Sequence, residues 1–185
     1  MDCPPNAEVL AIVSSANQQW LWDGRTHKAA ALYEKAARLS AADPVILFQS
    51  ARAQWALGRV DAARATLNTA RSRTRHLSGL GLDRLTKFER QLANGPRAKL
   101  PRQLQSDDLD VDRLEQVSLS PSEWSALADA AEERGVYGVA FFARGRAKGP
   151  ITVIDEEKEE WELVKRAESE LTLLDAMREC NHGAG

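Results

Sequence analysis

The feature of this sequence that most constrains its fold is a repeat with a period of 34 residues. When the stretch around Gly24 is aligned with the stretch around Gly58, the glycines, the arginines after them and several alanines coincide. The identical pairs include Ile12/Ile46, Gly24/Gly58, Arg25/Arg59, Ala29/Ala63, Ala31/Ala65 and Ala36/Ala70. A fixed period of this length is typical of stacked repeats, which bury their apolar faces against their neighbours. The period therefore predicts that residues 1–185 form a single domain built as a repeat array.

Composition and spacing predict that each repeat consists of two helices. Ala, Arg and Glu are abundant, β-branched residues are scattered, and apolar residues recur at helical spacing. Gly24 and Gly58 end the first helix of each unit, and Pro44 begins the second unit. Small alanines in the second helix of each unit allow the paired helices to approach closely. The predicted helices span residues 7–22, 26–40, 44–57 and 60–73.

This pattern resembles the tetratricopeptide repeat, which has two antiparallel helices, glycine in the turn and alanines in the second helix. The resemblance implies an all-α fold, a right-handed superhelical stack of antiparallel helix pairs. Repeat 1 is placed at 7–43 and repeat 2 at 44–77. A further match at 121–149 carries Trp124, Leu127, Ala128, Gly135, Tyr137, Ala140 and Ala147.

Two segments complete the predicted array. Residues 78–118 are expected to be a degenerate repeat with a loop at 95–109, because Gly135 lies nine residues beyond two periods from Gly58. Its helices are predicted over 81–94, with Leu82, Leu85, Phe88 and Leu92 on one face, and over 110–118. Residues 152–180 are predicted to form a long capping helix. Its apolar stripe would comprise Trp161, Val164, Ala167, Leu171, Leu174 and Met177.

Charge is distributed unevenly along the chain. Residues 1–102 contain 16 Lys or Arg against 8 Asp or Glu, whereas residues 103–185 contain 9 against 19. Three interpretations are open: the two halves attract within one chain, the basic half receives an acidic partner, or copies associate head to tail into a homo-oligomer.

No catalytic, metal or cofactor motif stands out. His27, His76 and His182 have no carboxylate or nucleophile at a spacing that would orient them, and Cys180 with His182 makes only two ligands. The sequence therefore predicts a protein that is not an enzyme and uses no cofactor. Nucleic-acid binding is disfavoured because the basic residues of the first half have no aromatic residues interleaved with them. These basic residues are Arg71, Arg73, Arg75, Arg97, Lys99 and Arg102.

The resemblance also implies a binding surface. In tetratricopeptide arrays the first helices of the pairs line a concave groove that binds a peptide or helix of another protein. The residues expected to bind a partner here are Gln18, Trp22, Phe48, Arg52 and Trp55. An adaptor or scaffold follows, with a bacterial assembly or secretion chaperone as a particular form. A self-assembling structural subunit, and a nucleic-acid-binding or regulatory module, are the alternatives.

The compartment is predicted to be the cytoplasm. No apolar run reaches the roughly 20 residues that a membrane span requires, and no charged-then-apolar leader follows Met1. A periplasmic or lipid-anchored protein is the alternative if a leader was removed before Cys3.

Overall fold

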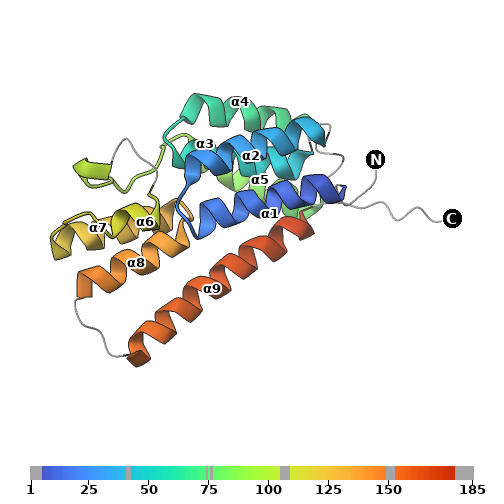
Figure 1. Cartoon of the computed structure of the whole chain (residues 1–185). Coiled ribbons are helices and arrows are strands. Elements are labelled where there is room, and N and C mark those ends of the chain that lie inside the picture. Colours follow the sequence, from blue (N-terminus) through green and yellow to red (C-terminus); the bar gives the residue numbers. More distant parts are fainter. Residues whose placement is uncertain are drawn as a thin grey trace.

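The computed structural model describes residues 6–40, 43–73, 75, 77–104, 109–148 and 153–177. Cys3, His76, Cys180, His182 and parts of the predicted segments 95–109 and 152–180 lie outside these residues. The helices are α1 (Ala7–Leu21), α2 (Thr26–Leu39), α3 (Pro44–Ala56), α4 (Val60–Arg71), α5 (Gly79–Leu92), α6 (Val111–Leu114), α7 (Pro121–Glu133), α8 (Tyr137–Lys148) and α9 (Val153–Ala176). Figure 1 shows them packed side by side, mostly as antiparallel neighbours. The predicted all-α stack of helix pairs is confirmed over the residues that the structure describes.

The first two helix pairs begin and turn as their sequences predict. Asn6 caps α1, because its Oδ1 accepts a hydrogen bond from the Val9 N–H at 2.9 Å. Asp43 caps α3 by accepting from the Val45 N–H at 2.8 Å. Gly24 and Gly58 both adopt positive φ, 74° and 75°, in the turn between the paired helices. That backbone conformation favours glycine, which explains why glycine recurs at the period.

The helices of a pair pack through small side chains. The repeated alanines are fully buried, namely Ala29, Ala36, Ala63 and Ala70. The pairs α1–α2, α3–α4 and α7–α8 pack most extensively, α2 packs on α3, and α4 packs on α5. The alanines therefore do what the period predicts: they let two helices approach while larger residues interlock around them.

The segment expected to form a degenerate repeat departs from the predicted pattern. Leu85, Phe88 and Leu92 of α5 are buried, but Leu82 is 41% exposed because buried Gly81 packs against the end of α9 in its place. The helix predicted over 110–118 is a single turn, α6, which packs on α8. The bounds of the four repeats stay a prediction.

The residues just before and within α6 are held by the first helix–helix turn. The Val111 N–H donates to the Asp23 carbonyl at 3.2 Å. The Arg25 guanidinium donates to Asp110 at 2.8 Å, and this hydrogen bond lowers the pKa of the Asp110 carboxyl below its ordinary value. Long-range contacts with the α1–α2 turn therefore oppose the helix pairing that the sequence pattern predicts here.

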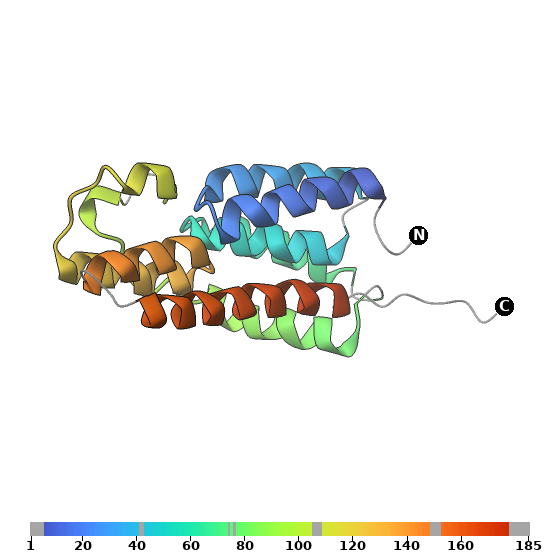
Figure 2. The same cartoon turned by 60° about the horizontal axis from the view of Figure 1, so that its bottom comes forward.

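Helix α9 lies beside α5 and contacts α8, as Figure 2 shows. Among the side chains that the structure describes here, Leu163, Ala167 and Leu174 of α9 and Met177 directly after it are buried apolar residues. The predicted stripe is therefore wrong at Trp161 and Leu171, which are 57% and 36% exposed. The helix is turned so that Leu163 faces the array, and Trp161 lies outside, where Lys165 Nζ approaches its ring at 5.2 Å.

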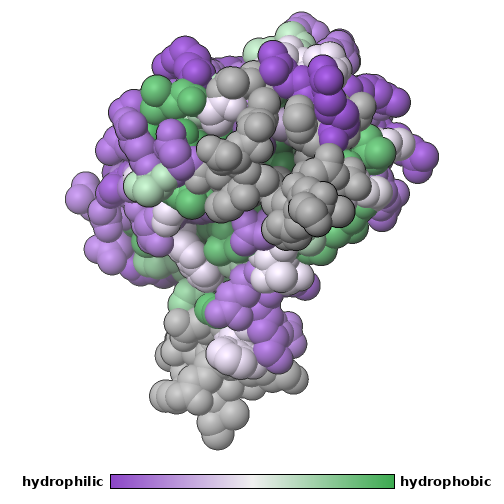
Figure 3. Space-filling view, turned by 90° about the vertical axis from the view of Figure 1, so that its right-hand side faces the viewer, coloured by the Kyte–Doolittle hydropathy of each residue, from purple (hydrophilic) through white to green (hydrophobic). Residues whose placement is uncertain are grey.

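The outer surface at one end of the array is mostly hydrophilic, with smaller hydrophobic areas between the charged groups (Figure 3). Leu10, Leu39 and Leu80, which lie near helix ends, are 40%, 47% and 39% exposed. Exposed leucines of this kind are ordinary on a folded protein.

Candidate functional site

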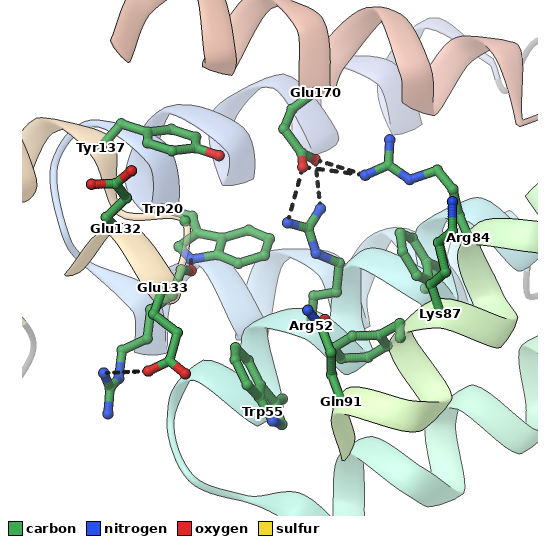
Figure 4. A pocket seen from close by; sticks show the side chains of 14 residues that line it. Trp20, Arg52, Trp55, Arg84, Lys87, Gln91, Glu132, Glu133, Tyr137 and Glu170 are labelled. Carbon is green, nitrogen blue, oxygen red and sulfur yellow. Dashed lines mark hydrogen bonds and ion pairs between the residues drawn. The ribbon is translucent and has the colours of Figure 1, made fainter. Parts of the chain in front are cut away.

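The candidate site lies on the side of α1, α3 and α5 that faces α9, called here the inner surface. Arg52 of α3 is at its centre, with only 17% of its side chain exposed. The Arg52 Nη1–H donates to Glu170 Oε2 at 2.7 Å and to Gln49 Oε1 at 3.1 Å, and Figure 4 shows the guanidinium pointing at Glu170. A residue of the second repeat is thus bound to α9, 118 positions further along the chain.

Glu170 also binds a second guanidinium. Arg84 of α5 donates from Nη2 to both Glu170 oxygens, at 3.2 and 3.3 Å. Burial alone raises the pKa of Glu170, but the charges and hydrogen bonds of Arg52 and Arg84 together outweigh it and leave that pKa below its ordinary value. One carboxylate therefore neutralises one of two neighbouring cations, and this cluster carries a net charge of about +1.

Aromatic rings surround the two guanidiniums. The Arg52 guanidinium lies 5.1 Å from the Trp20 ring centroid and 5.6 Å from that of Phe48. Arg84 lies 5.9 Å from the Phe48 ring. Such cation–π contacts contribute on the order of 0.5–2 kcal/mol each when water is largely excluded. The inner surface therefore presents fixed cations on an aromatic floor.

A second ion-pair cluster joins α9 to the last helix pair. Glu132 of α7 accepts hydrogen bonds from Arg144 of α8 and from Arg166 of α9. Ion pairs join the basic first half of the chain to its acidic second half. The cation comes from residues 1–102 and the anion from residues 103–185 in Arg25–Asp110, Arg25–Asp112, Arg52–Glu170 and Arg84–Glu170. The attraction between halves thus operates within one chain, while the acidic-partner and head-to-tail interpretations stay predictions.

Two adjoining cavities lie between α3, α5 and the α7–α8 turn, the first of them beside Glu170, and together they are called here the trough. The first, of about 300 Å³, includes Phe48, Arg52 and Trp55 in its lining. The second, of about 400 Å³, shares Trp55, Gln91 and Glu133 with the first. Figure 4 shows the side chains that line the first cavity, with Glu170 reaching toward it from α9.

Trp55 lines both cavities and has an unused hydrogen-bond donor. Only 7% of Trp55 is exposed, and its buried indole Nε1–H has no acceptor among the described residues. An unpaired buried donor costs about 1–3 kcal/mol, so an acceptor supplied by a bound molecule would be favourable.

The α7–α8 turn forms the opposite wall of the trough. The Trp20 Nε1–H donates to the Arg134 carbonyl at 3.1 Å. Arg134 Nη1 in turn donates to the Ala98 carbonyl at 3.0 Å, and Glu133 accepts from the Ala98 N–H at 2.7 Å. The wall is therefore tied both to α1 and to the segment that follows α5.

The five residues predicted to bind a partner do not lie together. Phe48, Arg52 and Trp55 line the trough. Gln18 lies elsewhere and donates from Nε2 to Asp23 at 3.1 Å. Trp22 is partly buried against the small apolar cluster that contains Leu21, Tyr137, Leu163 and Ala167. All five stay predictions as partner contacts.

Sequence reasoning missed Trp20, Arg84 and Glu170. The ring of Trp20 is buried in the core against Tyr33, and its indole N–H donates to the α7–α8 turn. Glu170 was hidden by the polar composition of α9, although it continues the spacing of the buried Leu163 and Ala167. That four-then-three spacing is the signal that points to Glu170.

The fold and the site define the class of this protein: a helical-repeat protein in which successive antiparallel helix pairs build an inner surface. Residues 23–76 match the family model of the tetratricopeptide repeat. This part of the chain is therefore similar to tetratricopeptide repeats, and such repeats generally mediate protein–protein interactions rather than catalysis. No curated protein and no solved structure matches the chain significantly. Of the helices in the described residues, none combines the length and hydropathy of a membrane crossing.

Proposed function

We propose that this protein is a non-enzymatic adaptor that binds a segment of a partner protein on its inner surface. The observation that carries the proposal is the trough, which is open beside α9 and is lined by Phe48, Arg52 and Trp55. Aromatic and arginine side chains are the types that most often dominate protein recognition. The small size of the array is also typical of assembly and secretion chaperones, the particular adaptor role predicted from the sequence.

A bulky substitution that fills the trough tests this function. Gln91 lines both cavities and is exposed on α5, so Gln91→Trp obstructs them without disturbing the core. Asn68→Trp is the matched control, because Asn68 is exposed on α4 and is absent from the lining of either cavity. The tagged wild-type chain and both variants are incubated with native lysate, and the captured proteins are identified by mass spectrometry.

We expect the Gln91→Trp variant to lose one or more proteins that the wild type and Asn68→Trp both capture. Circular dichroism of the three chains should be the same. Identical sets of captured proteins from all three chains would refute the trough as the partner site.

A further inference from the structure

Helix α9 presents a regular recognition pattern to the rest of the chain. The residues that face the array are Leu163, Ala167, Glu170, Leu174 and Met177, and their separations alternate between four and three. This spacing keeps all five on one side of a helix. The four apolar members are between 0% and 6% exposed, and the central Glu170 side chain is 19% exposed. The pattern is therefore two apolar positions, one carboxylate and two further apolar positions.

The array recognises this pattern in three places. Leu163 and Ala167 pack with Leu21 and Tyr137. Glu170 receives the two guanidiniums described above. At the far end, Met177 enters the main core.

Ser78 binds the backbone carbonyls at the C-terminal end of α9. The Ser78 Oγ–H donates to the Ala176 carbonyl at 2.7 Å, and the Ser78 N–H donates to the Met177 carbonyl at 2.9 Å. Contacts of this kind can form with any helix that has the same pattern, because they depend only on its apolar side chains, on one carboxylate and on the backbone carbonyls at its C-terminal end.

The central contact makes the surface selective for a carboxylate. Arg52 and Arg84 are largely buried, with 17% and 16% of their side chains exposed, and they lie on aromatic rings. A helix without an acid at this position would leave two neighbouring cations buried and unpaired, which is strongly unfavourable. The surface thus discriminates between helices by a penalty as well as by attraction.

We propose that the inner surface is a docking site for an amphipathic helix of the partner protein, and that α9 is its resident occupant. The incoming helix carries the same alternating spacing, with a Glu or Asp between two pairs of apolar residues, and takes the place of α9. Its flanking residues enter the trough. This inference rests on the proposed adaptor function and specifies the partner's chemistry.

A labelled peptide provides a direct test. The probe is a fluorescent, end-capped peptide with the sequence of residues 161–177, and its binding to the full-length chain is measured by fluorescence anisotropy. A tethered occupant competes at an effective concentration in the millimolar range, so the wild-type chain should bind the probe weakly. In the chain with Glu170→Lys, α9 is repelled by Arg52 and Arg84, and we expect the probe to bind at least tenfold more tightly.

The same substitution in the probe should have the opposite effect. A probe with Glu170→Lys should bind at least tenfold more weakly than the wild-type probe, whichever chain is used. Glu168→Lys is the matched control in both molecules, because Glu168 is exposed and makes the same change in charge. If Glu170→Lys unfolds the chain, Glu170→Gln keeps the shape of the side chain and should shift affinity in the same direction.

Three results would overturn the proposal. The first is equal binding of the wild-type probe by the Glu170→Lys and Glu168→Lys chains, and the second is unchanged binding of the Glu170→Lys probe. The third is a wild-type chain that is dimeric by light scattering and becomes monomeric with Glu170→Lys. The last result would make a second copy the occupant. If the probe binds as expected but Gln91→Trp captures the same proteins as the wild type, the trough is refuted as the partner site and the helix-docking site is retained. If the capture experiment gives the expected loss but the probe does not bind as expected, the adaptor function is retained and the replacement of α9 by a partner helix is refuted.

Discussion

Alanine at the two repeat-defining glycines should have unequal costs, although the two turns have almost the same backbone conformation. Gly24 and Gly58 have φ values of 74° and 75°. An alanine at either position must adopt the left-handed conformation, which costs about 1–2 kcal/mol. The space around the two positions differs: an added Cβ at Gly58 has no heavy atom within 4 Å.

At Gly24 an added Cβ would overlap with the Leu109 carbonyl and with Val139. The segment at Leu109 would have to move away, breaking the Val111-to-Asp23 hydrogen bond, worth about 0.5–1.5 kcal/mol. Leu109 is only 5% exposed, so losing its burial costs up to about 1.5–3 kcal/mol more. We therefore expect Gly58→Ala to destabilise the chain by about 1–2 kcal/mol and Gly24→Ala by about 3–6 kcal/mol.

Urea unfolding followed by circular dichroism measures both free energies of unfolding. Gly79→Ala is the control, because Gly79 opens α5 without a positive φ and with free space around it. That change should be neutral or slightly stabilising, by up to about 1 kcal/mol. Equal losses at Gly24 and Gly58 would contradict the packing of the Leu109 segment on the first turn.

Three further changes probe other parts of the structure. The pKa of Glu170 is lowered in the folded chain from its ordinary value of 4.5, so Glu170 stabilises the fold fully above that pH, and this contribution is lost as the pH falls through the lower folded value. Urea midpoints measured from pH 6 to 3 should therefore fall more for the wild type than for Glu170→Gln, and parallel curves would contradict this. Ser120→Ala removes the capping box of α7 and should cost about 1 kcal/mol in urea unfolding, whereas no loss would mean that the cap is dispensable. Leu163→Ala should cost about 2–4 kcal/mol because Leu163 is 1% exposed, whereas Leu171→Ala should cost under about 1 kcal/mol, and the reverse order of melting temperatures would mean that α9 is turned the other way.

The parts of the fold that were predictable from the sequence are those set by neighbouring residues. The Asn6 cap, the glycine turns and the buried alanines follow from contacts within one helix or one helix pair. A helix end or a close helix–helix contact leaves its mark at a fixed spacing, so periodicity is sufficient to locate it.

The central contact of the candidate site was not predictable in this way. The sequence singles out Arg52 by its position on an inner helix, but residues 103–185 contain 19 acidic residues that could have paired with it. The acidic residue that pairs with Arg52 is determined by the rotation of α9 about its own axis. That rotation is set by the packing of Leu163 and Met177 against distant helices. Side chains that meet across 118 residues leave no local pattern.

The same failure explains the segment between the repeats. Spacing predicts a second helix over 110–118, but Gly24 leaves room for the Leu109 carbonyl, and Arg25 binds Asp110. These contacts fix the backbone from outside, so local helix propensity does not decide its structure.

The distance in sequence between Arg52 and Glu170 also has a consequence during synthesis. Translation proceeds at about 5–20 residues per second, so the 118 residues between them take about 6–24 s to make. The first two helix pairs depend on short-range contacts and can fold within that interval, whereas α9 does not yet exist. For those seconds a growing chain lacks α9, so the Arg52 guanidinium has no Glu170 carboxylate to bind. A partner present at the ribosome would meet the inner surface without competition, and a partner arriving later would have to displace α9.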